Sequence, residues 1–315
     1  MIKSVFTLSL FLVLCAVVCG VSPFFGVETI APSEAWNSEI FWTFRVPRVL
    51  FGLLAGGCLA VAGMVFQSVF RNPLATPFTL GMASGAALGA SIAILCSATS
   101  VPVTVAAFGG ALLSLVLVFT IAKAAGGGET EMLLAGIAIS FICSSVIMLV
   151  QYISDPTQTV RMLRWTMGGL DSGGSKAVLR LLPWTLPILV ILWFSSRSLD
   201  LFSTGAELAA ARGLNTQRSR VVLLVLTSLM IAAVVSACGP IGFLGLMVPH
   251  IARRFVGVSH GVLFPAVFLT GATLLVFCDT LARCTIPPDE IPVGIFTALL
   301  GGPFFVGLLL FRRRS

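Results

Sequence analysis

Nine apolar stretches, each close to the length of a membrane helix, dominate this sequence. They lie near residues 4–22, 49–69, 78–98, 102–122, 132–153, 181–195, 221–238, 262–282 and 291–311. A helix needs about 20 mostly apolar residues to cross the hydrocarbon core of a bilayer. A shorter candidate at 241–256, broken by Gly and Pro like the stretch at 78–98, brings the expected total to about ten. The pattern predicts an all-α integral membrane protein with short or broken helices, forming a single domain over residues 1–315.

The composition supports this class, and the positions of the charges suggest an orientation. Apolar residues make up 57% of the chain and charged residues 10%, whereas soluble domains carry about 25% charged residues. With ten helices and the N-terminus inside, twelve Lys and Arg residues fall on the inner side and seven on the outer, as the positive-inside rule requires. We therefore expect both termini in the cytoplasm and a first helix that is retained rather than cleaved. The net charge of +7 reflects this topology, and no nucleic-acid partner is expected.

Several kinds of chemistry have no matching residues. The middles of the expected spans carry almost no ionisable side chains, which ion-coupled transporters use as relays. Asp279 is the nearest exception, and Arg283 one turn later is its expected partner. The string GGLDSGGSK at 168–176 departs from the pattern of a phosphate-binding loop. No grouping of Ser, His and an acidic residue suggests hydrolysis. The eight cysteines and two histidines lack the spacing of metal ligands. We expect no enzyme activity, metal or cofactor in this chain, so ATP hydrolysis would belong to another polypeptide.

The polar segment at 195–220 is longer than a simple connection requires. It contains a helix-forming piece, Ala206 to Arg212, preceded by the possible cap Ser203-Thr204-Gly205 and followed by Gly213. Two interpretations are open: a docking surface for a cytosolic partner, or an amphipathic helix lying on the membrane without a partner.

A second polar group is expected on the outer side. Arg45 and Arg48 of the string RVPR precede the second span, and Arg283 and Glu290 lie near the expected outer loop LARCTIPPDEIP. Such arginines either anchor helix ends at the membrane surface or bind an acidic partner outside the membrane.

Helix breakers cluster in two halves of the chain. Arg71-Asn72-Pro73 and Pro77 interrupt the first half, and Gly239-Pro240 and Pro249 interrupt the second. Broken backbone at membrane depth is tolerated where it is buried in protein or lines a wet cavity. Discontinuous helices in two halves of a chain point to a transporter built from inverted repeats.

Taken together, these motifs resemble a known family. The sequence contains, in order, RVPR, LLAGGCLAVAGMVFQSVFRNPLATPFTLGMASGAALGA, RWTMGGL, GPIGFLGLMVPHIARR and IPVGIFTALLGGPFFVGLLL. From about residue 40 to the C-terminus they resemble the permease subunits of ABC importers for iron–siderophore complexes, haem and cobalamin. The resemblance implies a ten-helix subunit of the bacterial cytoplasmic membrane that pairs with a second permease copy. Two cytosolic ATPase subunits would dock below, and a substrate-binding protein would dock above.

The resemblance also implies roles for individual residues. The cytoplasmic loop at about 197–219 would hold the coupling helices that fit a cleft on the ATPase, with a motif formed by Gly205, Glu207, Ala210, Gly213 and Leu214. The outward arginines that pair with acids on the binding protein would be Arg45, Arg48 and Arg283.

The helix at 129–150 resembles the one that lines the central pathway, with Thr130 at a cytoplasmic constriction. Ser140, Ser144 and Ser145 would form a mildly polar stripe on it, unless their hydroxyls bond back to their own helix. The structural motif residues are Arg71, Asn72, Pro73, Gly239, Pro240, Pro249 and His250.

The sequence thus predicts an importer permease that works by alternating access driven by partner ATPases. An iron chelate is the first expected cargo and cobalamin the second, because the resemblance is to a family of which most members handle iron chelates. The spans offer few polar groups to grip a substrate, so selectivity is expected to lie largely with the binding protein. An ion-coupled secondary transporter is the alternative, and it would need an intramembrane charge site.

Overall fold

The computed structural model describes residues 2–96, 101–171, 174–287 and 289–312, and all the regular elements within these ranges are helical. The α-helices are α1 (Ile2–Val21), α2 (Pro32–Ala35), α3 (Val46–Val69), α4 (Met82–Leu95), α5 (Val103–Ala124), α6 (Glu129–Ile153), α7 (Pro156–Met167), α8 (Ser175–Phe194), α9 (Ser196–Thr204), α10 (Ala206–Ala211), α11 (Thr216–Cys238), α12 (Leu244–Val256), α13 (His260–Cys284) and α14 (Val293–Arg312). Short helical turns occur at η1 (Ser22–Phe24), η2 (Phe41–Arg45) and η3 (Pro77–Leu80).

The long helices confirm an all-α membrane protein. Seven helices among the described residues are long and apolar enough to cross a bilayer, and α4 and α14 hold shorter apolar stretches. With α12, which has 13 residues, the helices at membrane depth number about ten, as predicted. The two stretches that contain breakers are the short ones: η3 and α4 replace a single helix at 78–98, and α12 begins only at Leu244.

Helix α3 forms the centre of the molecule, and small residues explain why its neighbours come so close. In its most apolar window, 89% of the residues are buried. A Cβ added to Gly56 would lie 2.5 Å from the carbonyl oxygen of Gly271 on α13, and one added to Gly63 would overlap the backbone of Gly245 on α12. Small residues at such contacts let helix backbones approach within a bilayer, so α3 is surrounded by protein rather than lipid.

The small residues from Gly81 to Ala90 serve the same purpose between α4 and α5. A Cβ added to Gly85 would lie 2.5 Å from the carbonyl oxygen of Gly110. Helices α4 and α5 are therefore in close backbone contact.

Both interruptions contain a non-glycine residue with left-handed backbone. Arg71, in the turn after α3, has φ 46°, and Phe243, just before α12, has φ 67°. L-residues rarely adopt this conformation because Cβ approaches the neighbouring carbonyl. The chain thus reverses sharply at both places that the breakers marked.

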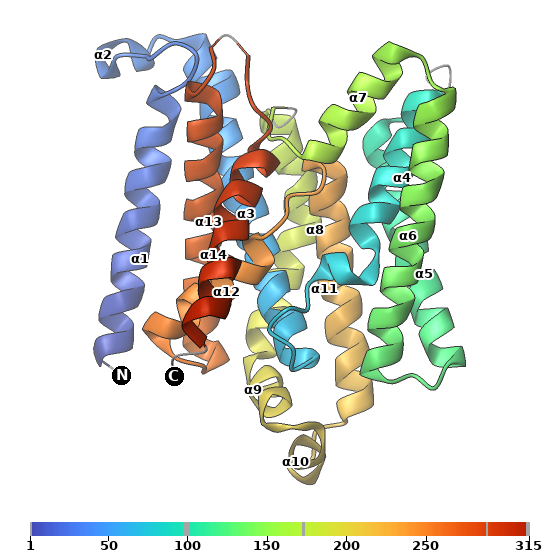
Figure 1. The fold of residues 1–315 in the computed structure, drawn as a ribbon. Helices are drawn as coiled ribbons and strands as arrows, with labels where there is room; N and C mark the ends of the chain where they lie inside the picture. The colour runs from blue at the N-terminus through green and yellow to red at the C-terminus, as the bar shows by residue number, and fades with distance from the viewer. Residues whose placement is uncertain (1, 97–100, 172–173, 288, 313–315) are drawn as a thin grey trace.

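Helices α7 and α9, like the single turn α2, were not predicted, and the two ends of the molecule differ. Helix α7 begins at a capping box in which the Asp155 side chain accepts from the Gln158 amide, and α9 occupies residues expected to be loop. Of the possible cap Ser203-Thr204-Gly205, Gly205, with φ 115°, is the N-cap of α10, whereas Ser203 and Thr204 belong to α9. Figure 1 shows α9, α10 and both chain ends at the lower end, called the inner end below, with α2 and α7 at the upper, outer end.

Candidate functional sites

A compact ion cluster joins α3 to α13 at the outer end. Arg48 donates from Nη2 to Asp279 Oδ1 at 2.8 Å and from Nε to both carboxylate oxygens at 3.1 Å, while its Nη1 reaches Glu290 at 2.6 Å. Arg283 Nε lies 3.1 Å from Asp279 Oδ2, which confirms the predicted pair one turn apart. The side chains of Asp279 and Arg283 are each only 3% exposed, so the cluster is largely shielded from solvent.

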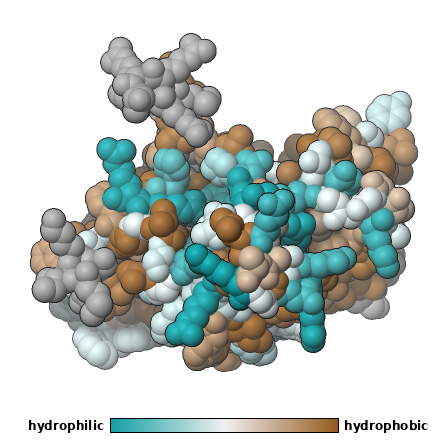
Figure 2. Space-filling view, turned by 90° about the horizontal axis from the view of Figure 1, so that it is seen from below, coloured by the Kyte–Doolittle hydropathy of each residue, from teal (hydrophilic) through white to brown (hydrophobic). Residues whose placement is uncertain are grey.

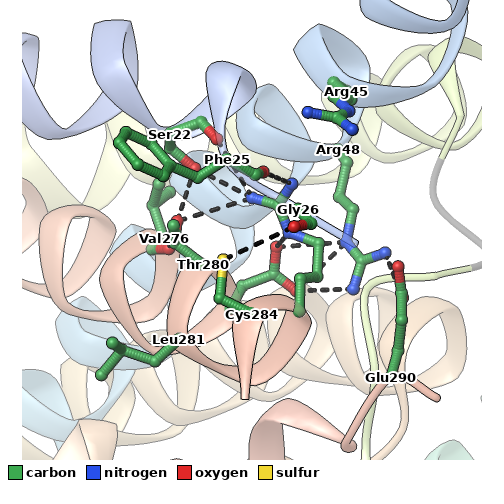
Figure 3. Close-up of polar contacts among 12 residues, drawn as sticks. Ser22, Phe25, Gly26, Arg45, Arg48, Val276, Thr280, Leu281, Cys284 and Glu290 are labelled. Atoms are coloured by element: carbon green, nitrogen blue, oxygen red, sulfur yellow. Dashed lines mark hydrogen bonds and ion pairs between the residues drawn. The ribbon is translucent and has the colours of Figure 1, made fainter. Parts of the chain in front are cut away.

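Arg283 of this cluster and the neighbouring Arg45 bind the chain segment that follows α1. Arg283 donates to the carbonyl oxygen of Phe25 at 2.8 Å and to Ser22 Oγ at 3.0 Å (Figure 3). Arg45 donates to the carbonyl oxygens of Pro23 and Glu28. Of the three arginines expected to face a binding protein, Arg283 is therefore buried, and Arg45 and Arg48 are half-buried. All three bind groups of this chain.

Next to this cluster, a recess opens below α7 at the outer end. It has a volume of about 320 Å³, and its lining includes Arg161, Arg164, Trp165 and Asp171 together with the ends of α4, α5 and α11. Both arginines are exposed and lie three residues apart on α7, so they share one side of the helix. No sequence motif indicated a role for these two arginines.

At the inner end, α9 and α10 project beyond the helix bundle. Leu199 and Phe202 bury α9 against the core, whereas Glu207, Leu208 and Ala210 of α10 are exposed. Figure 2 shows hydrophilic side chains gathered over this end of the molecule. Among the side chains of α10 at 207–211, which the structure describes, only that of Ala209 is fully buried, so α10 presents most of this surface away from the bundle.

The remaining motif residues of this loop lie around α10. Gly205 and Gly213 have φ 115° and 83°, which favour glycine, and they bound the helix on either side. Leu214 is half-buried and follows Gly213. The predicted piece Ala206 to Arg212 thus matches α10 within one residue.

A chain of polar contacts lies behind α9, and sequence reasoning missed it. Asp200 of α9 accepts from the backbone N–H of His260 at 2.9 Å and from its ring Nδ1 at 2.7 Å, and His260 Nε2 lies 2.6 Å from Ser68 Oγ on α3. His260 is 2% exposed and Ser68 5% exposed. The three residues are 60 and 192 positions apart in the sequence, so no local pattern could have indicated them.

The order of these groups matches a hydrolytic Ser, His and Asp arrangement, but the serine has a structural role. Ser68 lies inside α3, and its Oγ also lies 2.9 Å from the carbonyl oxygen of Met64 one turn earlier. A nucleophile has to reach a substrate, and this hydroxyl is packed between α3 and α13. We therefore interpret the three groups as a link between helices.

The start of α6 carries an ion pair and the expected constriction residue. Arg220 at the start of α11 donates to Glu129 Oε1 at 2.7 Å, and Arg71 lies 3.9 Å from Glu129 Oε2. Thr130 is the next residue and is exposed. Ser140 and Ser145 donate to the carbonyl oxygens of Gly136 and Phe141, each at 2.9 Å, which supports the self-bonded interpretation for these two, and Ser144 is exposed.

The structural motif residues lie at the two chain reversals. Asn72 Oδ1 accepts from the amide of Leu74 in the turn that holds Arg71 and Pro73. Gly239, with φ 70°, and Pro240 pack against Gly168 after α7. In α12, Pro249 is buried and the His250 ring meets Phe304 of α14 edge to face at 6.0 Å.

Comparison with known proteins identifies the family. The model of the FecCD transport family matches residues 5–312. The chain belongs to the FecCD transport family. It is a multi-pass membrane protein and a permease subunit of an ABC importer, so its ATP hydrolysis occurs on partner subunits and its function implies ATPase and binding-protein partners. The predicted family and fold class are thus confirmed, and the ion-coupled alternative is not supported.

Individual relatives differ in the cargo that they carry. The chain is 37% identical over 303 residues to the hemin transport system permease of Yersinia pestis, covering 92% of this chain and 91% of that protein. It is 39% identical over 281 residues to the Fe(3+)-citrate import permease of Bacillus subtilis (88% and 83% covered) and 35% identical over 318 residues to the vitamin B12 import permease of Escherichia coli (98% and 93% covered). A metal-chelate type ABC transporter solved in an inward-facing conformation superposes with a TM-score of 0.87 at 32% identity, with 98% of each chain covered.

Proposed function

We propose that this permease imports an iron chelate that carries carboxylates, as haem and ferric citrate do, across a bacterial cytoplasmic membrane. Relatives named for hemin, ferric citrate and vitamin B12 differ by only a few per cent in identity to this chain. Overall similarity therefore does not select a cargo, and the choice must come from groups that a cargo would meet.

The observation that carries this proposal is the pair of exposed arginines over the outer recess. Arg161 and Arg164 line it with Trp165, and Asp171 is the acid on its rim. Guanidinium groups bind carboxylates bidentately, and an indole face suits a flat or apolar ligand surface. Cobalamin, whose side-chain carboxyls are amides, offers these arginines a single phosphodiester and no carboxylate, so we rank it second.

Import would be driven through α9 and α10. The exposed residues Glu207, Leu208 and Ala210, bounded by Gly205 and Gly213, form a short helix that projects from the inner end. A projecting helix of this size suits a cleft on each ATPase subunit, so that closure of the ATPases on ATP moves α9 against the bundle. This assignment gives residues 197–219 the coupling role within one permease domain.

Docking of the binding protein would use the outer arginine cluster. Arg45 and Arg48 are half-buried and retain access from outside, whereas Arg283 is buried beneath them. We therefore assign direct contact with acidic residues of the binding protein to Arg45 and Arg48, and assign to Arg283 the support of the surface on which they lie.

The pathway would run between two copies of α6. Leu134, Phe141 and Met148 are 61%, 70% and 62% exposed, and their spacing of seven places them on one face of the helix. A second permease copy would cover part of this face and leave Thr130, Ser140 and Ser144 along the pathway, with lipid around the remaining helices. Both termini would then lie in the cytoplasm with α10.

Uptake by the reconstituted complex tests the cargo. Proteoliposomes that hold this chain with its ATPase and binding-protein partners are supplied with hemin, ferric citrate or cobalamin, and the cargo inside is measured over time. We expect the wild type to take up a carboxylate-bearing chelate, and we expect this uptake to fall at least fivefold in an Arg161→Gln, Arg164→Gln variant. Lys176→Gln on α8 is the matched charge control, and it should leave the uptake unchanged. Cobalamin uptake that is unaffected by the double variant would refute the assignment of cargo.

A further inference from the structure

Side chains at the inner end of α3 contact three other helices, α6, α12 and α13, and connect to α9 through His260. The family assignment does not account for them. Gln67 and Ser68 occupy consecutive positions near the end of this central helix, and Arg71 lies in the turn that follows. We propose that these residues form a polar hub that transmits movement of the coupling helices to the pathway helix α6. The proposal rests on the proposed function, because it presumes that ATPases act on α9 and α10.

The first arm of the hub runs from α9 through α13 to α3. Both N–H groups that meet Asp200 come from His260, the first residue of α13. One is a backbone amide at a helix N-terminus, which has no partner within its own helix, and a carboxylate there also interacts favourably with the helix dipole. Asp200 therefore caps α13 from another helix, and any shift of α9 pulls on the start of α13.

His260 passes this connection to the central helix. A carboxylate only accepts hydrogen bonds, so Nδ1 of His260 donates to Asp200. The other ring nitrogen lies 2.6 Å from Ser68 Oγ, so a single buried ring joins α9 and α3. His260 and Ser68 are buried, whereas the side chain of Asp200 is 41% exposed. Hydrogen bonds are stronger in the protein interior than in water, so the contact between His260 and Ser68 is the firmer part of this connection.

The second arm fastens α12 at the adjacent position. Gln67 Nε2 donates to the carbonyl oxygens of Gly245 and Leu246 at 3.0 and 3.3 Å, and its Oε1 accepts from Arg253. These contacts hold both ends of the short α12 to α3. Because Gln67 and Ser68 are neighbours, α12, α13 and α9 are all fixed within one turn of α3.

The third arm reaches the pathway helix. Arg71 follows Ser68 by three residues and lies 3.9 Å from Glu129, the first residue of α6, which Arg220 of α11 also contacts at 2.7 Å. Helix α11 begins five residues after α10 ends. The start of α6, beside Thr130, is thus held from α3 on one side and from the end of the coupling segment on the other.

A continuous path of contacts shows only that these residues lie close together. Whether movement passes along the path has to be measured, as an energetic coupling between the ATPase contact and the pathway. The readout that separates transmission from simple stability is the number of cargo molecules imported per ATP hydrolysed by the assembled complex. A variant that only weakens folding lowers uptake and hydrolysis together. A variant that removes a contact of the hub without weakening the fold lowers uptake while hydrolysis continues.

The decisive variants are Asp200→Ala, His260→Ala and the pair combined, measured in proteoliposomes with the chelate that the wild type imports. We expect each single variant to keep its ATPase subunits and its hydrolysis within about twofold, and to lose about tenfold in cargo per ATP, a size typical of coupling between sites. The double variant should be no worse than either single one, because both remove the same link. Asp200→Asn, whose amide oxygen still accepts from both N–H groups, should restore the ratio to within about twofold.

Two further substitutions test the arms separately. Ser68→Ala removes the contact with His260 and a bond to the carbonyl oxygen of Met64 in its own helix. It is the smallest of these truncations, and it should lower the cargo per ATP as His260→Ala does. Glu129→Gln should lower the cargo per ATP, while Glu131→Gln on the same turn of α6 is the matched control. An unchanged cargo per ATP in Asp200→Ala and Glu129→Gln, additive losses in the double variant, or an Asp200→Asn variant as poor as Asp200→Ala would overturn the hub. If the wild type itself imports nothing with ATP, the proposed function fails instead.

Discussion

Replacing Asp279 with alanine should destabilise the protein far more than replacing its neighbour Glu290. Asp279 is 3% exposed and compensates two guanidinium groups, Arg48 at 14% exposure and Arg283 at 3%. In Asp279→Ala, Arg48 keeps Glu290, but Arg283 retains only neutral oxygen acceptors. Removing one partner of a buried ion pair lowers the free energy of unfolding by about 3–5 kcal/mol, because the other charge stays buried. Arg283 keeps its neutral acceptors, so we expect Asp279→Ala to cost about 3 kcal/mol, near the lower end of that range.

The matched variant is Glu290→Ala at the same cluster. Glu290 is 36% exposed, and partly exposed ion pairs contribute about 0–1 kcal/mol. Asp279→Asn, which keeps an oxygen acceptor without the charge, should fall between the two. The free energy of unfolding is measured by SDS titration in mixed micelles, followed through tryptophan fluorescence. A cost below about 1 kcal/mol for Asp279→Ala, or equal costs for both alanine variants, would refute the argument, since buried charges left unpaired are expected to cost several times more.

Two other substitutions test the packing and the chain reversal. Gly63→Ala should sharply lower the yield of folded protein in size-exclusion chromatography, because its Cβ would overlap the backbone of Gly245, whereas Gly109→Ala, with nothing within 4 Å of the added Cβ, should not; equal yields would contradict the close contact of α3 and α12. Arg71→Gly should leave the free energy of unfolding unchanged or raise it by about 1 kcal/mol, because glycine relieves the left-handed backbone, while the cargo imported per ATP falls; a clear loss of stability would show that the Arg71 side chain mainly holds the fold.

Most of the fold could be predicted because membrane helices obey simple local rules. The lengths of the apolar stretches predicted the spans, because a helix that crosses the bilayer needs about 20 mostly apolar residues. The breakers at Arg71-Asn72-Pro73 and Gly239-Pro240 correctly marked the two interruptions. Helix α7 was missed because its 12 residues are too polar for a span, although the capping pair Asp155 and Gln158 could have revealed it.

The sites were only partly predictable, because their partners are distant in sequence. The pair Asp279 and Arg283 lies on one helix and was predicted, but Arg48, 231 residues from Asp279, could be added only from the fold. Likewise, the motif of the coupling segment indicated α10, whereas the contact of Asp200 with His260 and Ser68 depends on how α9, α13 and α3 pack. The roles in coupling, docking and the pathway stay predictions until they are measured.

The most direct test of the whole account is ATP-driven chelate uptake through α10. Proteoliposomes are prepared with wild-type complex and with a Glu207→Arg, Gly213→Trp variant, both in the presence of the chelate-loaded binding protein, and cargo and released phosphate are measured together. The account predicts uptake that requires ATP in the wild type and that is lost, together with binding of the ATPase subunits, in the variant. Chelate uptake of equal rate without any ATPase subunit, or an unchanged rate in the variant, would contradict it.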